Sequence, residues 1–369
     1  MAIRKASERI SGGQEHNRGP RRCWCVAREG GQAIAQAATP VRLVRLAGLP
    51  GLLPVLLASC AAAPEADPDL VLVSNEQRDL VHVVDGGSGT IEGRLETGGR
   101  PRGLALSLDG QTLYVAASRS NRIEAWDPRA RRRLRVYAAG SDPERFALAP
   151  DGRSLFVANE DAALISRLDL ATGEIVWQVE VGPEPEGVAV SPDGKLVVST
   201  AETSSTVHFL DAATGRPRAV ALVGSRPRDV LFVPARNEIW VSSELRGTIA
   251  VFDAATLKLA GTIDLVPAFP DLETVQAVEM EATRDGRRAF VAMGRSNRVA
   301  EIDPVTRRVA RSFPTGLRTW GLDLSPDERR LYAASGLSGE LTIVDLAANR
   351  VARTVKLGGK PWTVESIRG

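Results

Sequence analysis

A short segment of alternating apolar residues that ends in aspartate recurs seven times along the chain at an almost constant interval. Five of the six intervals are 42 residues, and the remaining one is 50. The seven aspartates are Asp85, Asp127, Asp169, Asp211, Asp253, Asp303 and Asp345. An Asp-Gly turn or its equivalent lies eighteen residues before each of the last six, and a proline or its equivalent lies eight residues before that turn. A fixed period of this length indicates a repeat architecture built from one supersecondary unit.

Each repeat predicts four short antiparallel strands. In the repeat that ends its third strand at Asp211, these are EGVAVS, LVVST, TVHFLD and PRAVALV. Strict alternation of apolar and polar residues favours strands, and the intervening Asp and Gly residues favour hairpin turns. Because the apolar period is two and a Gly or Pro recurs about every ten residues, helical repeats of similar length are excluded. A four-stranded unit of about 40–45 residues is typical of a β-propeller blade.

The two ends of the repeat region predict how the ring closes. The first strand-like segment, LVLVSNE at 70–76, begins inside a blade, and the last, PWTVESI at 361–367, is one extra first strand. We therefore predict an all-β, seven-bladed β-propeller of four-stranded antiparallel blades over 70–369, with three-plus-one closure that removes a free sheet edge. The eight additional residues of the long interval fall around Leu265–Glu273 and predict a longer loop into blade six.

The small net charge of +2 is unevenly distributed along the chain. The first sixty residues carry nine basic and three acidic residues, whereas the remainder carries 38 and 42 and has a net charge of −4. An Arg-rich segment at 130–137, ARRRLRVY, falls on the predicted outermost strand of blade two, where charge discourages pairing between sheets. We therefore expect no nucleic-acid partner.

The segment before the repeats has the layout of a secretory signal. Arg42 and Arg45 precede an apolar stretch at 46–59 that is too short to span a bilayer. The sequence Leu-Ala-Ser-Cys ending at Cys60 resembles the lipobox of bacterial lipoproteins, in which the cysteine is acylated, and ordinary cleavage near Ala61–Ala63 is the alternative. The predicted organisation is an upstream extension plus signal peptide at 1–59, with the true start near Val41, then a linker at 60–69 and the propeller. We expect a periplasmic protein that contacts a membrane only through a lipid anchor.

Two loops in each blade are expected to meet at one face of the propeller. Residues nine positions before each repeated aspartate and those just after each proline position are therefore candidates for a ligand or partner face, because variation between repeats at one face is how a propeller builds a site. We call these the mouth residues: Glu76, Arg102, Glu144, Glu160, Glu186, Glu202, Arg228, Glu244, Trp320 and Trp362. Arg102 and Arg228 could hold a carboxylated ligand through bidentate pairing. The alternative is a solvated polar rim, with tryptophans that only plug the channel.

Catalytic and metal sites are not expected. Each repeated aspartate begins a tight turn, where its carboxylate accepts a backbone N–H, so the seven do not form a ligand ring. His82 and His208 occupy the same strand position in nonadjacent blades, which favours packing over metal binding. All three cysteines, Cys23, Cys25 and Cys60, lie in the first sixty residues, so no thiol nucleophile belongs to the repeats.

The units LYVAAS and LFVANE, together with the turn PDG, resemble the YVTN family of bacterial β-propeller repeats. VSNEQRDLVHVVD, GPEPEGVAVSPDGKLVVSTAET and SRPRDVLFVPARNEIWVSSE are most similar to the seven-repeat propellers associated with pyrroloquinoline quinone (PQQ)-dependent catabolism. The resemblance implies a periplasmic accessory of alcohol oxidation by quinoprotein dehydrogenases, with a dehydrogenase or a transporter component as partner. PQQ enters as a ligand by this association only.

The expected function is therefore binding or scaffolding in such a quinoprotein system, without catalysis of its own. The alternative is a lactonase-like propeller hydrolase that uses Glu and Arg at the channel mouth. Glu and Arg are present at the mouth positions, but the His that such a channel mouth also carries is missing from them.

Overall fold

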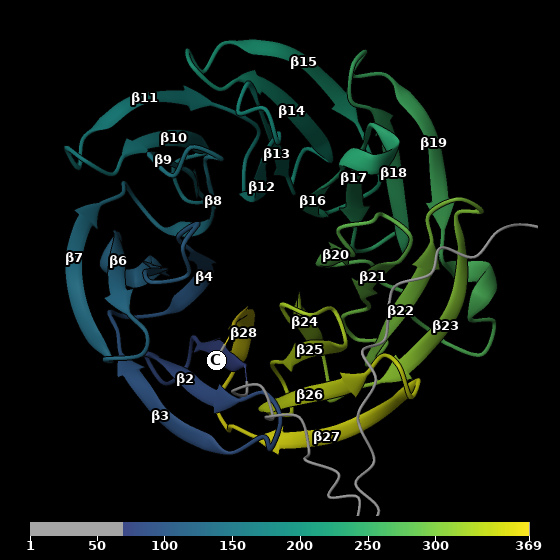
Figure 1. The fold of residues 1–369 in the computed structure, drawn as a ribbon. Helices are drawn as coiled ribbons and strands as arrows, with labels where there is room; N and C mark the ends of the chain where they lie inside the picture. The colour runs from purple at the N-terminus through teal and green to yellow at the C-terminus, as the bar shows by residue number, and fades with distance from the viewer. Residues whose placement is uncertain (1–68, 369) are drawn as a thin grey trace, which may run out of the picture. The chain divides into compact units, whose positions relative to one another are not determined.

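The computed structural model describes residues 69–368 (Figure 1). Lipidation of Cys60, the signal at 1–59 and the linker up to residue 68 lie outside the described residues and remain predictions. Within the described part of the chain, no helix is long and apolar enough to cross a bilayer.

Seven four-stranded antiparallel sheets surround a central channel, as predicted (Figure 1). The blades, each given from the channel outward, are as follows: blade 1, β28 (Pro361–Ile367), β1 (Leu70–Asn75), β2 (Leu80–Asp85) and β3 (Ile91–Glu96); blade 2, β4 (Pro101–Leu106), β5 (Leu113–Ala117), β6 (Arg122–Asp127) and β7 (Arg132–Ala138); blade 3, β8 (Pro143–Leu148), β9 (Ser154–Asn159), β10 (Leu164–Asp169) and β11 (Ile175–Glu180); blade 4, β12 (Pro185–Val190), β13 (Leu196–Ala201), β14 (Thr206–Asp211) and β15 (Pro217–Leu222); blade 5, β16 (Pro227–Val233), β17 (Glu238–Ser243), β18 (Thr248–Asp253) and β19 (Leu259–Asp264); blade 6, β20 (Met280–Ala282), β21 (Ala289–Ala292), β22 (Arg298–Asp303) and β23 (Arg308–Pro314); blade 7, β24 (Thr319–Leu324), β25 (Arg330–Ser335), β26 (Glu340–Asp345) and β27 (Arg350–Lys356).

The predicted closure is confirmed: β28, from the end of the chain, pairs antiparallel with β1, from its beginning, and completes blade 1. The longer loop into blade 6 is also confirmed, since no strand forms between β19 and β20, and the short 3₁₀ helix η3 (Val266–Ala268) lies there. Two further 3₁₀ turns, η1 (Ser118–Ser120) and η2 (Pro234–Arg236), lie in loops of blades 2 and 5.

The hydrophobic core consists of seven apolar clusters, one at each interface between neighbouring blades. The second and third strands of each blade are largely buried, whereas the fourth strands face solvent on alternate residues. The middle strands are covered on both faces by neighbouring blades, so nearly all of their residues are buried. The outer strand has one face in solvent, so exposed and less exposed residues alternate along it.

The repeated aspartates act as predicted, at the turn between the third and fourth strands. Asp127 Oδ1 accepts the backbone N–H groups of Arg129 and Ala130 at 3.1 and 2.8 Å, and the other six repeated aspartates each accept at least one such bond. The Arg-rich segment lies on β7, the exposed outer strand of blade 2, also as predicted.

Candidate functional site

The mouth of the channel lies where the first strands begin. The pairing register of the first and second strands shifts next to the mouth residue in blades 2 to 5, for example between Pro101 and Leu104. A β-bulge interrupts the regular alternation of side chains along a strand and changes the direction of the residue beside it. Arg102 therefore points toward the mouth, whereas Leu104 on the same strand is buried between blades. The local irregularity therefore brings these residues into contact at the mouth.

Arg102 joins three blades. Its Nε donates to Glu76 Oε2 of blade 1 at 3.0 Å, and its Nη1 donates to Glu144 of blade 3 at 2.5 Å. Its guanidinium carbon also lies 4.0 Å from the ring centre of Trp362, a cation–π arrangement. Arg102 is therefore already paired on its edge and on its face.

Arg228 is the second hub and is only 4% exposed. Its Nη1 contacts the carboxylates of Glu186, at 2.5 Å, and of Glu202, and its Nε lies 3.8 Å from Glu244. Three carboxylates from blades 4 and 5 therefore surround one guanidinium. Neither Arg102 nor Arg228 is free to hold a ligand carboxylate as the sequence analysis suggested, because both are committed to glutamates of the protein.

Trp320 and Trp362 stack on one another, with ring centroids 4.4 Å apart and an interplanar angle of 27°. Both are nearly buried, at 7% and 8% exposure. Arg228 and Arg318 lie over Trp320, with guanidinium carbons 4.8 and 4.3 Å from its ring centre. The tryptophans thus belong to a packed plug, and not to an open aromatic wall.

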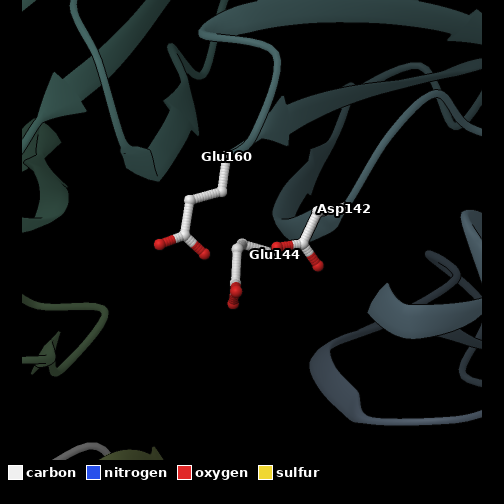
Figure 2. Close-up of side chains that lie close together, drawn as sticks. All are labelled: Asp142, Glu144 and Glu160. Carbon is white, nitrogen blue, oxygen red and sulfur yellow. The ribbon is translucent and has the colours of Figure 1, made fainter.

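Three carboxylates gather at the blade 3 side of the mouth: Asp142, Glu144 and Glu160 (Figure 2). One carboxylate oxygen from each lies within 4.8 Å of the others. Arg100 lies among them, with Nη1 3.1 Å from Asp142 and Nη2 2.9 Å from Glu144. A cation could bind here only in competition with this guanidinium.

Burial and the adjacent Glu160 raise the pKa of Glu144 well above its usual value.

The two glutamates that share Arg228 have divergent pKa values. Burial, and then the adjacent Glu186, raise the pKa of Glu202 to about 8. Burial opposes ionisation of Glu186 too, but the charge of Arg228, a hydrogen bond with Glu202 and the charges of Arg102 and Arg145 together outweigh it and lower the pKa of Glu186. The pair therefore holds one proton and one negative charge near neutral pH.

A cavity of about 240 Å³ opens above the plug. Seven of the ten mouth residues line it, and Glu144, Glu202 and Glu244 lie behind them through the ion pairs described above. The structure thus brings all ten predicted residues together at one end of the channel. The sequence analysis missed Arg226, Arg318 and Lys360, which also line the cavity. They lie two positions before a mouth residue in three blades, so a comparison of that register position would have found them.

A second charged layer, also missed, lies deeper in the first strands. Arg145 pairs with Glu279 and lies 3.6 Å from Asp229. Glu281, Asp323 and Glu365 then occupy one register position in the adjacent blades 6, 7 and 1. Burial and their mutual repulsion raise the pKa values of Glu281 and Glu365, and burial above all raises that of Asp323 to about 7. The signal for these three acids was their equivalent position in consecutive repeats, three residues after Val278, Trp320 and Trp362.

Comparisons with known proteins agree with this architecture. The model of the YNCE-like β-propeller family matches residues 71–235, and a model described as outer membrane protein assembly factor BamB matches residues 161–314. A comparison with curated proteins found no match.

Several solved structures share the fold. The periplasmic gluconolactonase of Pseudomonas aeruginosa is 23% identical, with a TM-score of 0.68, over 81% of this chain and 99% of that one. A putative 6-phosphogluconolactonase from Bacteroides fragilis is 17% identical, with a TM-score of 0.68, over 83% and 99%. Hydrazine synthase of Kuenenia stuttgartiensis is 21% identical, with a TM-score of 0.67, over 79% and 99%. At these identities the likeness establishes the fold alone.

Proposed function

We propose that this seven-bladed propeller of the YNCE/PQQ-repeat type is an exported, non-catalytic binding protein that serves a periplasmic quinoprotein-dependent alcohol-oxidation system. The observation that carries the binding role is the pairing at the mouth. Arg102 and Arg228 hold five glutamates from four blades in place around the stacked tryptophans. A surface ordered before its ligand arrives loses little conformational entropy on binding.

The same pairing disfavours nucleophilic or general-base chemistry by these groups. A general base must be able to accept a proton from the substrate, and the ionised carboxylates here are neutralised by neighbouring guanidinium groups. The cavity of about 240 Å³ is small for a whole-ligand site, so it suits a small ligand or one end of a larger one. Support for the quinoprotein setting comes from the sequence resemblance, with PQQ or a dehydrogenase partner as the candidates.

Two measurements test this proposal. Purified protein is titrated calorimetrically with PQQ, and immobilised protein is used to capture a purified quinoprotein alcohol dehydrogenase. We expect saturable binding in at least one of them, weakened by Glu160→Gln at the mouth and unchanged by Arg287→Gln, whose side chain is 85% exposed outside the mouth. No binding in either measurement overturns the proposed function.

Lactone hydrolysis is the second candidate, favoured by one observation at the mouth. Glu202, with a pKa of about 8, is a carboxylic acid that keeps its proton at neutral pH, as a general acid must. Structural neighbours whose names describe lactonases share the fold. Turnover of gluconolactone that is abolished by Glu202→Gln would favour this candidate over the first.

A further inference from the structure

Arg318 differs from the other arginines of the mouth in having no carboxylate partner within residues 69–368. Its Nε–H is buried and donates to no acceptor in the described part of the protein, whereas the backbone N–H of Arg318 donates to Asn297 Oδ1 at 2.8 Å. A buried donor of a charged group without an acceptor costs free energy, and a ligand that supplies the acceptor recovers it. The guanidinium of Arg318 thus lies over Trp320 at the cavity with part of its hydrogen-bonding capacity unused.

Three of the four charged residues with the largest effect on Arg318 are positive. Burial lowers the pKa of its guanidinium, and Arg295, Arg228 and Arg226 lower it further, although Glu244 acts in the opposite direction. The mouth positions of the two blades beside it carry no carboxylate, since blade 6 has Val278 and blade 7 has Trp320. The acids of the mouth are concentrated in blades 3 to 5, so the cavity wall around Arg318 has an excess of positive charge.

The cavity is also open beside Arg318. Gly336 lines it, and a Cβ at that position would lie 2.9 Å from Trp320 Cδ1 and 3.0 Å from its Nε1. Only a residue without a side chain can therefore pack this closely against the indole edge. No described residue accepts a hydrogen bond from the Trp320 indole N–H, whereas Trp126, Trp177 and Trp240 each donate to the protein.

We propose that this side of the mouth binds the oxyanion of a small ligand, a carboxylate or a phosphate, with Arg318 as the principal donor, Arg295 as a supporting charge and the Trp320 indole as a further donor. The unused Nε of Arg318, the positive residues near it and the unpartnered indole N–H of Trp320 all fit an anion, and a planar guanidinium pairs with either group. The inference deepens the proposed binding role and is independent of the quinoprotein setting.

The test uses two probe anions, citrate and inorganic phosphate, titrated at pH 7 and constant ionic strength. Binding is followed by calorimetry and by tryptophan fluorescence, which the contact between Arg318 and Trp320 should make sensitive to the anion. We expect saturable binding of at least one probe. Arg318→Gln should weaken it at least about tenfold, Arg295→Gln about threefold, and the matched control Arg287→Gln not at all.

Tighter binding of citrate assigns a carboxylate ligand, and tighter binding of phosphate assigns a phosphorylated one. The inference is overturned if the parent protein binds neither probe saturably, or if Arg318→Gln and Arg295→Gln both bind as the parent does. Anion binding that depends on Arg318, without any capture of PQQ or a dehydrogenase, would keep this site and overturn the proposed function. Capture of PQQ or a dehydrogenase without anion binding would keep the proposed function and overturn this site.

Discussion

Trp320 of blade 7 stacks on Trp362 of β28, the strand that closes blade 1 by pairing with β1, with ring centroids 4.4 Å apart. Arg102 covers Trp362 from blade 2, with its guanidinium carbon 4.0 Å from the ring centre. The closure of the propeller and the floor of its mouth are therefore built by the same side chains.

Replacement of Trp362 by Ala should destabilise the whole ring. The change removes a nearly buried indole and the contacts with Trp320 and Arg102, and losses of about 3–5 kcal/mol are usual for Trp→Ala in a core. Urea unfolding followed by circular dichroism measures it. Trp362→Phe, which keeps a ring against Trp320, should lose less than half as much, and equal losses for the two variants would contradict the stacking role.

Arg228→Gln should be costly because it leaves Glu186 buried without its counter-charge. We expect a loss of about 3–5 kcal/mol in the free energy of unfolding at pH 8, and a smaller loss at pH 5, where Glu186 can take up a proton. The exposed pair of Arg218 and Asp211 supplies the control, since Arg218→Gln should cost under about 1 kcal/mol. A loss at pH 5 as large as that at pH 8 would argue against an electrostatic origin.

The deep acidic layer predicts that stability falls as pH rises. Asp323 and Glu365 have pKa values raised above those of an unfolded chain, so their protonated forms favour the folded state. Their contribution is fully present below about pH 4 and is lost as pH rises through the folded value, about 7 for Asp323. Glu365 faces the carboxylates of Asp323, Glu281 and Glu279, which raise its pKa, and the positive charge of Arg145, which lowers it.

Glu365→Gln should therefore stabilise the protein at pH 8, by an amount of the order of 1–3 kcal/mol, and change it little at pH 4.5. Chemical unfolding at several pH values between 4.5 and 8 gives the slope directly. Stabilisation that is the same at both ends of this range would mean that packing, and not the charge of Glu365, is responsible.

Gly187→Ala should strain the contact between blades 4 and 5. An added Cβ would lie 2.7 Å from the carbonyl oxygen of Arg228 and 2.8 Å from Asp229 Cα, which are backbone atoms that cannot rotate away. A loss of about 1–3 kcal/mol is expected from such overpacking, measured as a lower urea midpoint. At Gly99 the nearest atoms belong to the flexible Arg119 side chain at 3.3 Å, so Gly99→Ala should cost less.

The sequence alone predicted the architecture because propeller information is local and repeated. Each 42-residue unit carries its own alternation and its own turn residues, and these determine four strands without reference to the other blades. The segment at 361–367 predicted closure for the same reason, because it matches only the first strand of the repeat unit. Equivalent positions in a ring meet at one face, so the mouth residues could also be predicted as a group.

The tertiary structure alone decided how those residues are paired. Arg102, Arg228 and Arg318 occupy similar places in their repeats, yet two are surrounded by glutamates and the third has none among the described residues. That difference depends on side chains that reach across from neighbouring blades, tens of residues apart in the chain, and on β-bulges that re-aim them. An ion pair needs its charged atoms within about 4 Å of each other, so it is set by the final packing of the ring, whereas strand formation is set within each repeat.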